Sequence, residues 1–151
     1  MRRAQAQATV ELTPEAARRL WLDVGRWPAF VEGFAHTVEV SPDWPSEGAK
    51  LVWQSVPSGR GRVTERVAEG AAERFVTDVY EDSLVGKQTI SFAEVAEGTR
   101  IELRLDYELS RYGPLRALAD AVFIRRALRD ALRRTLRRFA VEAEEDARIG
   151  G

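Results

Sequence analysis

The chain has 151 residues, 44% of them hydrophobic and 31% charged, and a formal net charge of −1. These values are typical of one folded domain and argue against a general nucleic-acid-binding protein. The absence of cysteine excludes disulfides, thiolate catalysis and cysteine-ligated zinc. A single histidine, His36, makes an all-histidine metal site or a Ser-His-Asp triad hard to assemble, so we expect no metal and no cofactor.

The apolar runs are too short to span a bilayer, so no membrane span is expected. The basic N-terminal segment is not followed by the continuous apolar stretch of a signal peptide. We therefore expect a cytoplasmic protein.

The N-terminal region predicts a strand followed by two short helices. Residues 4–12 alternate polar with small or apolar side chains, as a strand does. Thr13 suits a helix N-cap and Pro14 the first helical position. Gly25 is expected to end that helix, and Pro28 can open a second, shorter one.

Residues 35–110 read as strands separated by turns rich in Gly, Pro and Asp. The clearest strand covers residues 99–109, where Ile101, Leu103 and Leu105 alternate with charged side chains. Strict alternation of this kind predicts an antiparallel sheet with one face buried and the other exposed to water.

A charged helix is predicted from Pro114 to about Ala147. Its apolar residues form two stripes, one ending at Val122 and Phe123 and the other beginning at Ile124, which point to different sides of the helix. Either the helix bends near Phe123, or its first turns pack on a different surface from the rest. One straight helix on one flat surface does not fit this pattern.

Residues 124–139 hold seven arginines and one aspartate. We interpret them mainly as the solvated back of an amphipathic helix, because an acidic segment follows and no aromatic residue is interleaved with the arginines. The alternative is a surface for anionic lipid, nucleic acid or a partner protein.

Several short motifs appear in a characteristic order along the chain. They are Thr13-Pro14-Glu15, Trp21 with Asp23, Arg26-Trp27-Pro28, Gly98-Thr99-Arg100, Gly113-Pro114-Leu115 and the Arg-rich segment 125–139. With the order of elements, they resemble the helix-grip fold of the START-like (SRPBCC) superfamily, particularly its bacterial polyketide cyclase/dehydrase-like members.

The resemblance implies one START-like domain over residues 1–151 in the α+β class. A curved antiparallel sheet of about six to seven strands would wrap around the long C-terminal helix, with two short helices after the first strand. A mostly apolar cavity would lie between sheet and helix. Family members use such a cavity to hold lipids, sterols, quinones, plant hormones or polyketide intermediates, but a fold does not by itself settle function.

Twelve residues are candidates for lining that cavity, although most apolar faces serve packing first. Trp21 is assigned to the core, whereas Phe30 and Phe34, beyond the Gly25–Pro28 turn, are expected to gate the pocket. The candidates are Phe30, Phe34, His36, Trp53, Glu65, Tyr80, Gln88, Phe92, Tyr107, Val122, Phe123 and Leu128.

Two candidates carry particular expectations. His36 is in phase with Val38 and Val40 and so is expected to face inward, although a lone histidine there is usually structural. Tyr107 is the single polar tip on the inner face of the last strand and needs a partner for its hydroxyl.

The orientation of Glu65 stays open. If Val63 and Val67 point inward, its carboxylate enters the cavity and burial should raise its pKa. The alternative places Arg62, Thr64 and Arg66 inside, and Asp78 and Tyr80 raise the same question on the next strand.

The leading functional hypothesis is binding of an apolar or amphipathic small molecule, such as a lipid, quinone or polyketide, for storage, transport or presentation. No nucleic-acid partner is expected. The alternative is a polyketide aromatase or cyclase that would need a positioned acid or base, for which Glu65, Asp78, Tyr80 and Tyr107 are the candidates. A third reading is a protein-partner module that uses the Arg-rich helix.

Overall fold

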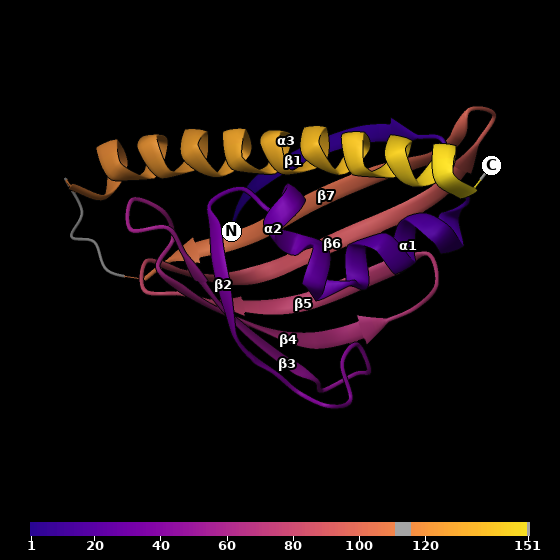
Figure 1. Ribbon diagram of the computed structural model, residues 1–151. Coiled ribbons are helices and arrows are strands. Elements are labelled where there is room, and N and C mark those ends of the chain that lie inside the picture. The colour runs from indigo at the N-terminus through magenta and orange to yellow at the C-terminus, as the bar shows by residue number, and fades with distance from the viewer. Residues whose placement is uncertain (111–115, 151) are drawn as a thin grey trace.

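The computed structural model describes residues 1–110 and 116–150. Seven strands, two short α-helices, a 3₁₀ turn and one long helix follow one another along this part of the chain (Figure 1). The elements are β1 (Arg2–Val10), α1 (Pro14–Leu22), η1 (Val24–Arg26), α2 (Trp27–Phe30), β2 (Phe34–Val40), β3 (Lys50–Ser55), β4 (Arg62–Gly70), β5 (Arg74–Tyr80), β6 (Leu84–Val95), β7 (Gly98–Leu109) and α3 (Arg116–Gly150).

The strands form one antiparallel sheet in the order β1-β7-β6-β5-β4-β3-β2. Helix α3 crosses one face of this sheet, with α1 and α2 on the same side (Figure 1). The buried apolar side chains of the sheet and the helices fill the space between the two layers. The predicted α+β helix-grip architecture, with two short helices after the first strand, is confirmed.

The first helix begins as the sequence predicts but ends differently. The hydroxyl of Thr13 accepts a hydrogen bond from the backbone N–H of Ala16 at 3.2 Å, which caps the helix. The helix already ends at Leu22, because Asp23 adopts an extended conformation and its carbonyl then accepts from the N–H of Arg26. Gly25 therefore lies inside the 3₁₀ turn η1, and its expected role as the helix terminator is wrong.

The two edges of the sheet differ in regularity. Strand β2, at one edge, has register shifts between Phe34 and His36 and between Thr37 and Glu39. Strand β1, at the other edge, pairs with β7 without interruption over its nine residues. The shifts break the alternation of side chains along β2 but leave that of β1 intact.

Helix α3 is straight and continuous, and the bend considered from the sequence does not occur (Figure 1). Its second apolar stripe is buried against the sheet and the short helices. Val122 and Phe123 of the first stripe pack on no other surface, with exposed fractions of 49% and 73%. Leu115 and the side chains of 116–121, which include the rest of that stripe, lie outside the described residues.

No helix in the described ranges is long and apolar enough to cross a membrane. Within the same ranges, no cluster of three or more His, Asp or Glu side chains could hold a metal ion.

Candidate ligand site

The space beneath α3 is almost completely filled by side chains. A partly enclosed cavity of about 30 Å³ lies there, which is room for about one or two water molecules. It is lined by Trp21, Trp27, Val31, Glu32, Trp53, Arg60, Glu65, Gln88, Leu103, Ala131, Leu132 and Thr135. Seven of these twelve residues are aromatic or aliphatic, and the other five are polar or charged.

Glu65 is the most unusual member of this lining. Val63, Glu65 and Val67 are all buried on the inner face of β4, so the strand carries the carboxylate into the interior. Trp53 Nε1 donates a hydrogen bond to Glu65 Oε2 at 2.9 Å, and Thr77 Oγ1 donates to Oε1 at 3.0 Å. Burial raises the pKa of Glu65 above its usual 4.5, and the hydrogen bonds from Trp53 and Thr77 and the charge of Arg60 offset this only in part.

Arg60 and Glu81 form a second buried pair beside Glu65. Arg60 Nε lies 2.6 Å from Glu81 Oε2, and the Glu81 side chain is only 2% exposed. The guanidinium also lies over the ring of Trp53, with its central carbon 5.7 Å from the ring centroid. Burial is the main cause of a raised pKa at Glu81, whereas the charge and hydrogen bond of Arg60 act in the opposite direction.

One nitrogen of this guanidinium, Nη2 of Arg60, is buried and has no hydrogen-bond partner among the described residues. Arg60 also belongs to the cavity lining. The guanidinium of Arg60 therefore pairs with Glu81, acts on Glu65 through its charge, and retains an unused donor at the edge of the cavity.

Contacts between Glu32, in the segment that follows α2, and α3 close the cavity on another side. The backbone N–H of Glu32 donates to Thr135 Oγ1 at 3.0 Å, and the Glu32 carboxylate lies 2.7 Å from Arg138 and 3.6 Å from Arg134. This segment between α2 and β2 is thus held against the middle of α3. Any opening of the cavity on this side has to break these contacts.

The structure brings three of the predicted residues to the cavity: Trp53, Glu65 and Gln88. Phe34 lies close by, because its half-buried ring stacks on Trp53 with the ring centroids 5.4 Å apart. The open question about Glu65 is therefore answered, since its side chain lies on the inner face. Asp78 and Tyr80 lie on the opposite face of β5, where Asp78 pairs with Lys87 and Tyr80 is 50% exposed.

Other candidates pack in the core rather than at the cavity. Phe30 was expected to gate the pocket, but it is fully buried, stacked on Trp21 at 5.6 Å and edge-on to Phe139 at 5.2 Å. It fills the core between α2 and α3. Trp21 is buried in the core, as expected, and also lines the cavity. Phe92 and Leu128 are also buried without lining the cavity.

Tyr107 is completely buried, and its hydroxyl has no hydrogen-bond partner among the described residues. Burial raises its pKa above the usual value, opposed by the charges of Arg2 and Arg125. Tyr107 does not line the cavity beneath α3.

The expectation that His36 faces inward is wrong. His36, Val38 and Val40 are all exposed, because β2 is the edge strand and its register shifts interrupt the alternation. Val122 and Phe123 likewise face solvent on the first turns of α3.

Sequence reasoning missed the residues that come to the site from turns and from other strands. Arg60 lies between Gly59 and Gly61 in the turn before β4, and Glu81 follows the end of β5, so neither belongs to a periodic pattern. Thr77 could have been found, because it alternates with Phe75 on the buried face of β5.

Comparisons with known proteins agree with this architecture. A family model described as "Polyketide cyclase / dehydrase and lipid transport" matches residues 1–144. No curated protein sequence matches the chain.

Solved structures share the fold at low sequence identity. The structure of TTHA0849 from Thermus thermophilus has a TM-score of 0.75 at 18% identity and covers 94% of this chain and 97% of that one. The di-domain ARO/CYC StfQ from the steffimycin biosynthetic pathway has a TM-score of 0.77 at 17% identity, with 96% of this chain and 51% of that chain covered. Norcoclaurine synthase from Thalictrum flavum, in complex with dopamine and hydroxybenzaldehyde, has a TM-score of 0.58 at 16% identity, with 80% and 83% covered.

Identities this low establish a common fold and leave the activity open. The family model, in contrast, spans nearly all of the sequence. The chain belongs to the polyketide cyclase/dehydrase and lipid transport family.

Proposed function

We propose that the protein binds an amphipathic small molecule of the lipid, quinone or polyketide class beneath α3. The observation that carries this proposal is the presence of Glu65 and Arg60 among the aromatic and aliphatic side chains that line the cavity. The apolar part of the ligand would contact the aromatic and aliphatic side chains of the lining. An oxygen of the ligand would accept a hydrogen bond from Arg60.

The energetics of buried polar groups support this assignment. Burying a carboxylate or leaving a guanidinium donor unpaired costs free energy that an apolar side chain of similar size would avoid. Both costs are present here, at Glu65 and at Nη2 of Arg60. A carbonyl, phenol or carboxyl oxygen on a ligand would satisfy the unused donor and so offset part of the cost.

The cavity must widen to accept such a ligand, because about 30 Å³ is far below the several hundred Å³ of ordinary ligand pockets. Two parts of the lining lie outside the strands, so we expect the cavity to open there with the sheet intact. One is the 56–61 turn, which carries Arg60, and the other is the segment at Glu32, which is held to α3 by polar contacts. Burial of apolar ligand surface contributes about 25 cal/mol per Å² before the costs of association and opening.

The test is a thermal-shift and native mass spectrometry screen with a long-chain fatty acid, a naphthoquinone and an aromatic polyketide. At least one of these classes should raise the Tm and give a one-to-one complex. Ala131→Leu, which narrows the cavity, should abolish the shift, whereas Ala127→Leu on the exposed side of the same helix should retain it. No shift and no complex with any class would overturn the proposal, as would equal binding by both variants.

An enzyme of the cyclase or dehydratase type is the second candidate, and the raised pKa of Glu65 specifically favours it. A carboxyl group with a raised pKa keeps its proton to higher pH than an ordinary glutamate and can donate it to a ketone oxygen. If the protein is such an enzyme, Glu65→Gln should keep ligand binding but lose turnover of a poly-ketone chain. The exposed Glu97→Gln should change neither, and turnover by Glu65→Gln at the wild-type rate would exclude Glu65 as the acid.

A further inference from the structure

We propose that the groove between β1 and α3 binds an extended acidic segment of a partner protein, which adds as a further strand to the edge of β1. This site lies on the outside of the fold and is separate from the cavity beneath α3. The proposal rests on three features of the described residues: a sheet edge without a bulge or a proline, an open groove beside it, and two arginines along the groove.

The edge of β1 lacks two of the usual features that prevent strand addition, a bulge and a proline, although its first two residues, Arg2 and Arg3, are exposed and charged and α3 packs along the strand. Edge strands expose a row of backbone N–H and C=O groups and are normally short, bulged or interrupted by proline. The opposite edge strand, β2, follows this rule with its two register shifts. Strand β1 runs nine residues without a shift or a proline and pairs on one side with β7.

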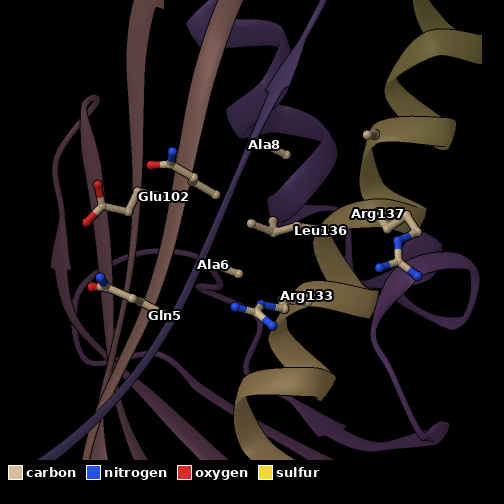
Figure 2. Close-up of a pocket in the computed structure, with 9 residues that line it drawn as sticks. Gln5, Ala6, Ala8, Glu102, Arg133, Leu136 and Arg137 are labelled. Carbon is tan, nitrogen blue, oxygen red and sulfur yellow. The ribbon is translucent and has the colours of Figure 1, made fainter.

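The groove beside this edge has a volume of about 620 Å³. Figure 2 shows Ala6 and Ala8 of β1 on one side and Leu136, Arg133 and Arg137 of α3 on the other. The small alanine side chains leave the space between strand and helix open. Gln5, Gln7, Glu102 and Ala140 complete the lining.

The positive charge of the groove favours an acidic partner. Arg133 and Arg137 are exposed and form no ion pair with any described residue, and Glu102 is the one acidic side chain in the lining. Two helical residues four positions apart lie about 6 Å apart along the axis, whereas alternate residues of a strand lie about 6.7 Å apart. Carboxylates at every second position of an added strand would therefore match the two guanidinium groups.

A second copy of this chain is a poor occupant of the same edge. Antiparallel pairing of β1 with its own copy would bring Arg133 and Arg137 of both molecules together at one interface. Like charges placed this close disfavour the complex. An acidic segment from a different protein has no such penalty.

The direct test uses a ten-residue peptide with Glu at alternate positions, and its binding is measured by fluorescence anisotropy at low salt. Binding should weaken at least tenfold in Arg133→Glu/Arg137→Glu. The control, Arg126→Glu/Arg148→Glu, reverses two exposed charges on the same helix outside the groove and should change the affinity less than about twofold. Equal weakening by both double variants would overturn the proposal.

Strand addition is separated from plain charge attraction by two further peptides, N-methylated at the odd or at the even positions. All three peptides carry the same charges, but a strand that pairs along one edge needs the N–H groups of one parity only. One methylated peptide should lose binding while the other keeps it, and the amides of β1 should gain protection from hydrogen exchange with the unmodified peptide. Equal binding by both methylated peptides would show nonspecific attraction, and a wild-type dimer that competes with the peptide would identify a second copy as the occupant.

Discussion

At Glu65, burial and hydrogen bonding act on the pKa in opposite directions. Its carboxyl group is buried between Trp53 and Thr77, both of which donate hydrogen bonds to it. These bonds favour the ionised form, whereas burial favours the protonated form and has the larger effect on the pKa. The folded protein therefore binds the proton of Glu65 more tightly than the unfolded chain does.

The stability of the protein should accordingly depend on pH through Glu65. The contribution of this group is fully present below its unfolded pKa of about 4.5 and is lost as the pH rises through the higher folded pKa. Glu65→Gln does not undergo this loss. The Tm of the variant minus that of the wild type should thus increase from pH 4.5 to pH 8, by about 3 °C for every kcal/mol by which the free energy of unfolding of the wild type decreases.

Differential scanning fluorimetry across this range measures the effect, with Glu97→Gln as the exposed control. A difference between Glu65→Gln and wild type that stays constant with pH would contradict the raised pKa.

Position 98 requires glycine because of its backbone conformation and the closeness of β1. It has a φ of +136°, and a Cβ there would clash with the carbonyl oxygen of Val10 on the adjacent strand β1. Gly48 also has a positive φ, +87°, but has open space around it.

Gly98→Ala should therefore destabilise the protein more than Gly48→Ala does. Strain alone costs about 1 to 3 kcal/mol at either site, and the clash with Val10 adds to it at Gly98. Urea unfolding at pH 7 measures both variants. Equal losses of the free energy of unfolding would show that β1 can move away from Gly98.

At the scale of the elements, α3 depends on the short segment η1–α2 as well as on the sheet. Arg26 at the end of η1 contacts both oxygens of Asp146, at 2.9 and 3.1 Å, and also Glu142 at 2.8 Å. These hydrogen bonds, that to Asp146 foremost, hold the pKa of Arg26 above its usual range. Through these contacts, the guanidinium of Arg26 holds the later turns of α3 against η1.

Arg26→Ala should loosen the later turns of α3 more than it destabilises the whole fold. The loss in the free energy of unfolding should be about 1 kcal/mol, because the contact is partly exposed. Amide hydrogen exchange should become faster in residues 142–150, whereas Arg148→Ala, which removes one exposed pair with Glu144, should leave it unchanged. Unchanged exchange in Arg26→Ala would show that packing alone holds these turns.

The two ends of α3 should also respond differently to truncation of an aromatic side chain. Phe139 is fully buried against Phe30 and Trp21, so Phe139→Ala should cost about 3 to 5 kcal/mol. Phe123 is 73% exposed, and Phe123→Ala should stay within about 0.5 kcal/mol of wild type. Chemical denaturation measures both, and a large loss in Phe123→Ala would show that the first turns of α3 pack on a surface in solution.

Across the whole molecule, the parts of the fold that follow local patterns could be predicted from the sequence. The alternation in residues 99–109 and the N-cap at Thr13 depend on neighbours along the chain, and both are confirmed. The alternation around Glu65 showed which residues share its face but not which face is buried. That choice depends on the pairing of β4 with β3 and β5, which places Trp53 and Thr77 near the carboxylate.

The rest of the candidate site could not be predicted, because it is assembled by long-range contacts. Arg60 and Glu81 reach the site from turns, where no periodicity indicates the direction of a side chain. His36 was misplaced for a related reason, since the irregular pairing of β2 with β3 is a property of the folded sheet. Pattern reasoning is reliable within an element and fails where two distant elements meet.

The position of β1 in the sheet also has a consequence for the order in which the protein can fold. Strands β2 to β6 each pair with the strand that follows, so these hairpins can form as soon as the chain leaves the ribosome. Strand β1 is made first but pairs with β7, with Arg2 opposite Tyr107, and has to wait until about a hundred further residues have been synthesised. Until β7 and then α3 emerge, only α1 and α2 can cover the apolar inner face of the growing sheet, which makes this interval the period of greatest exposure to misassociation.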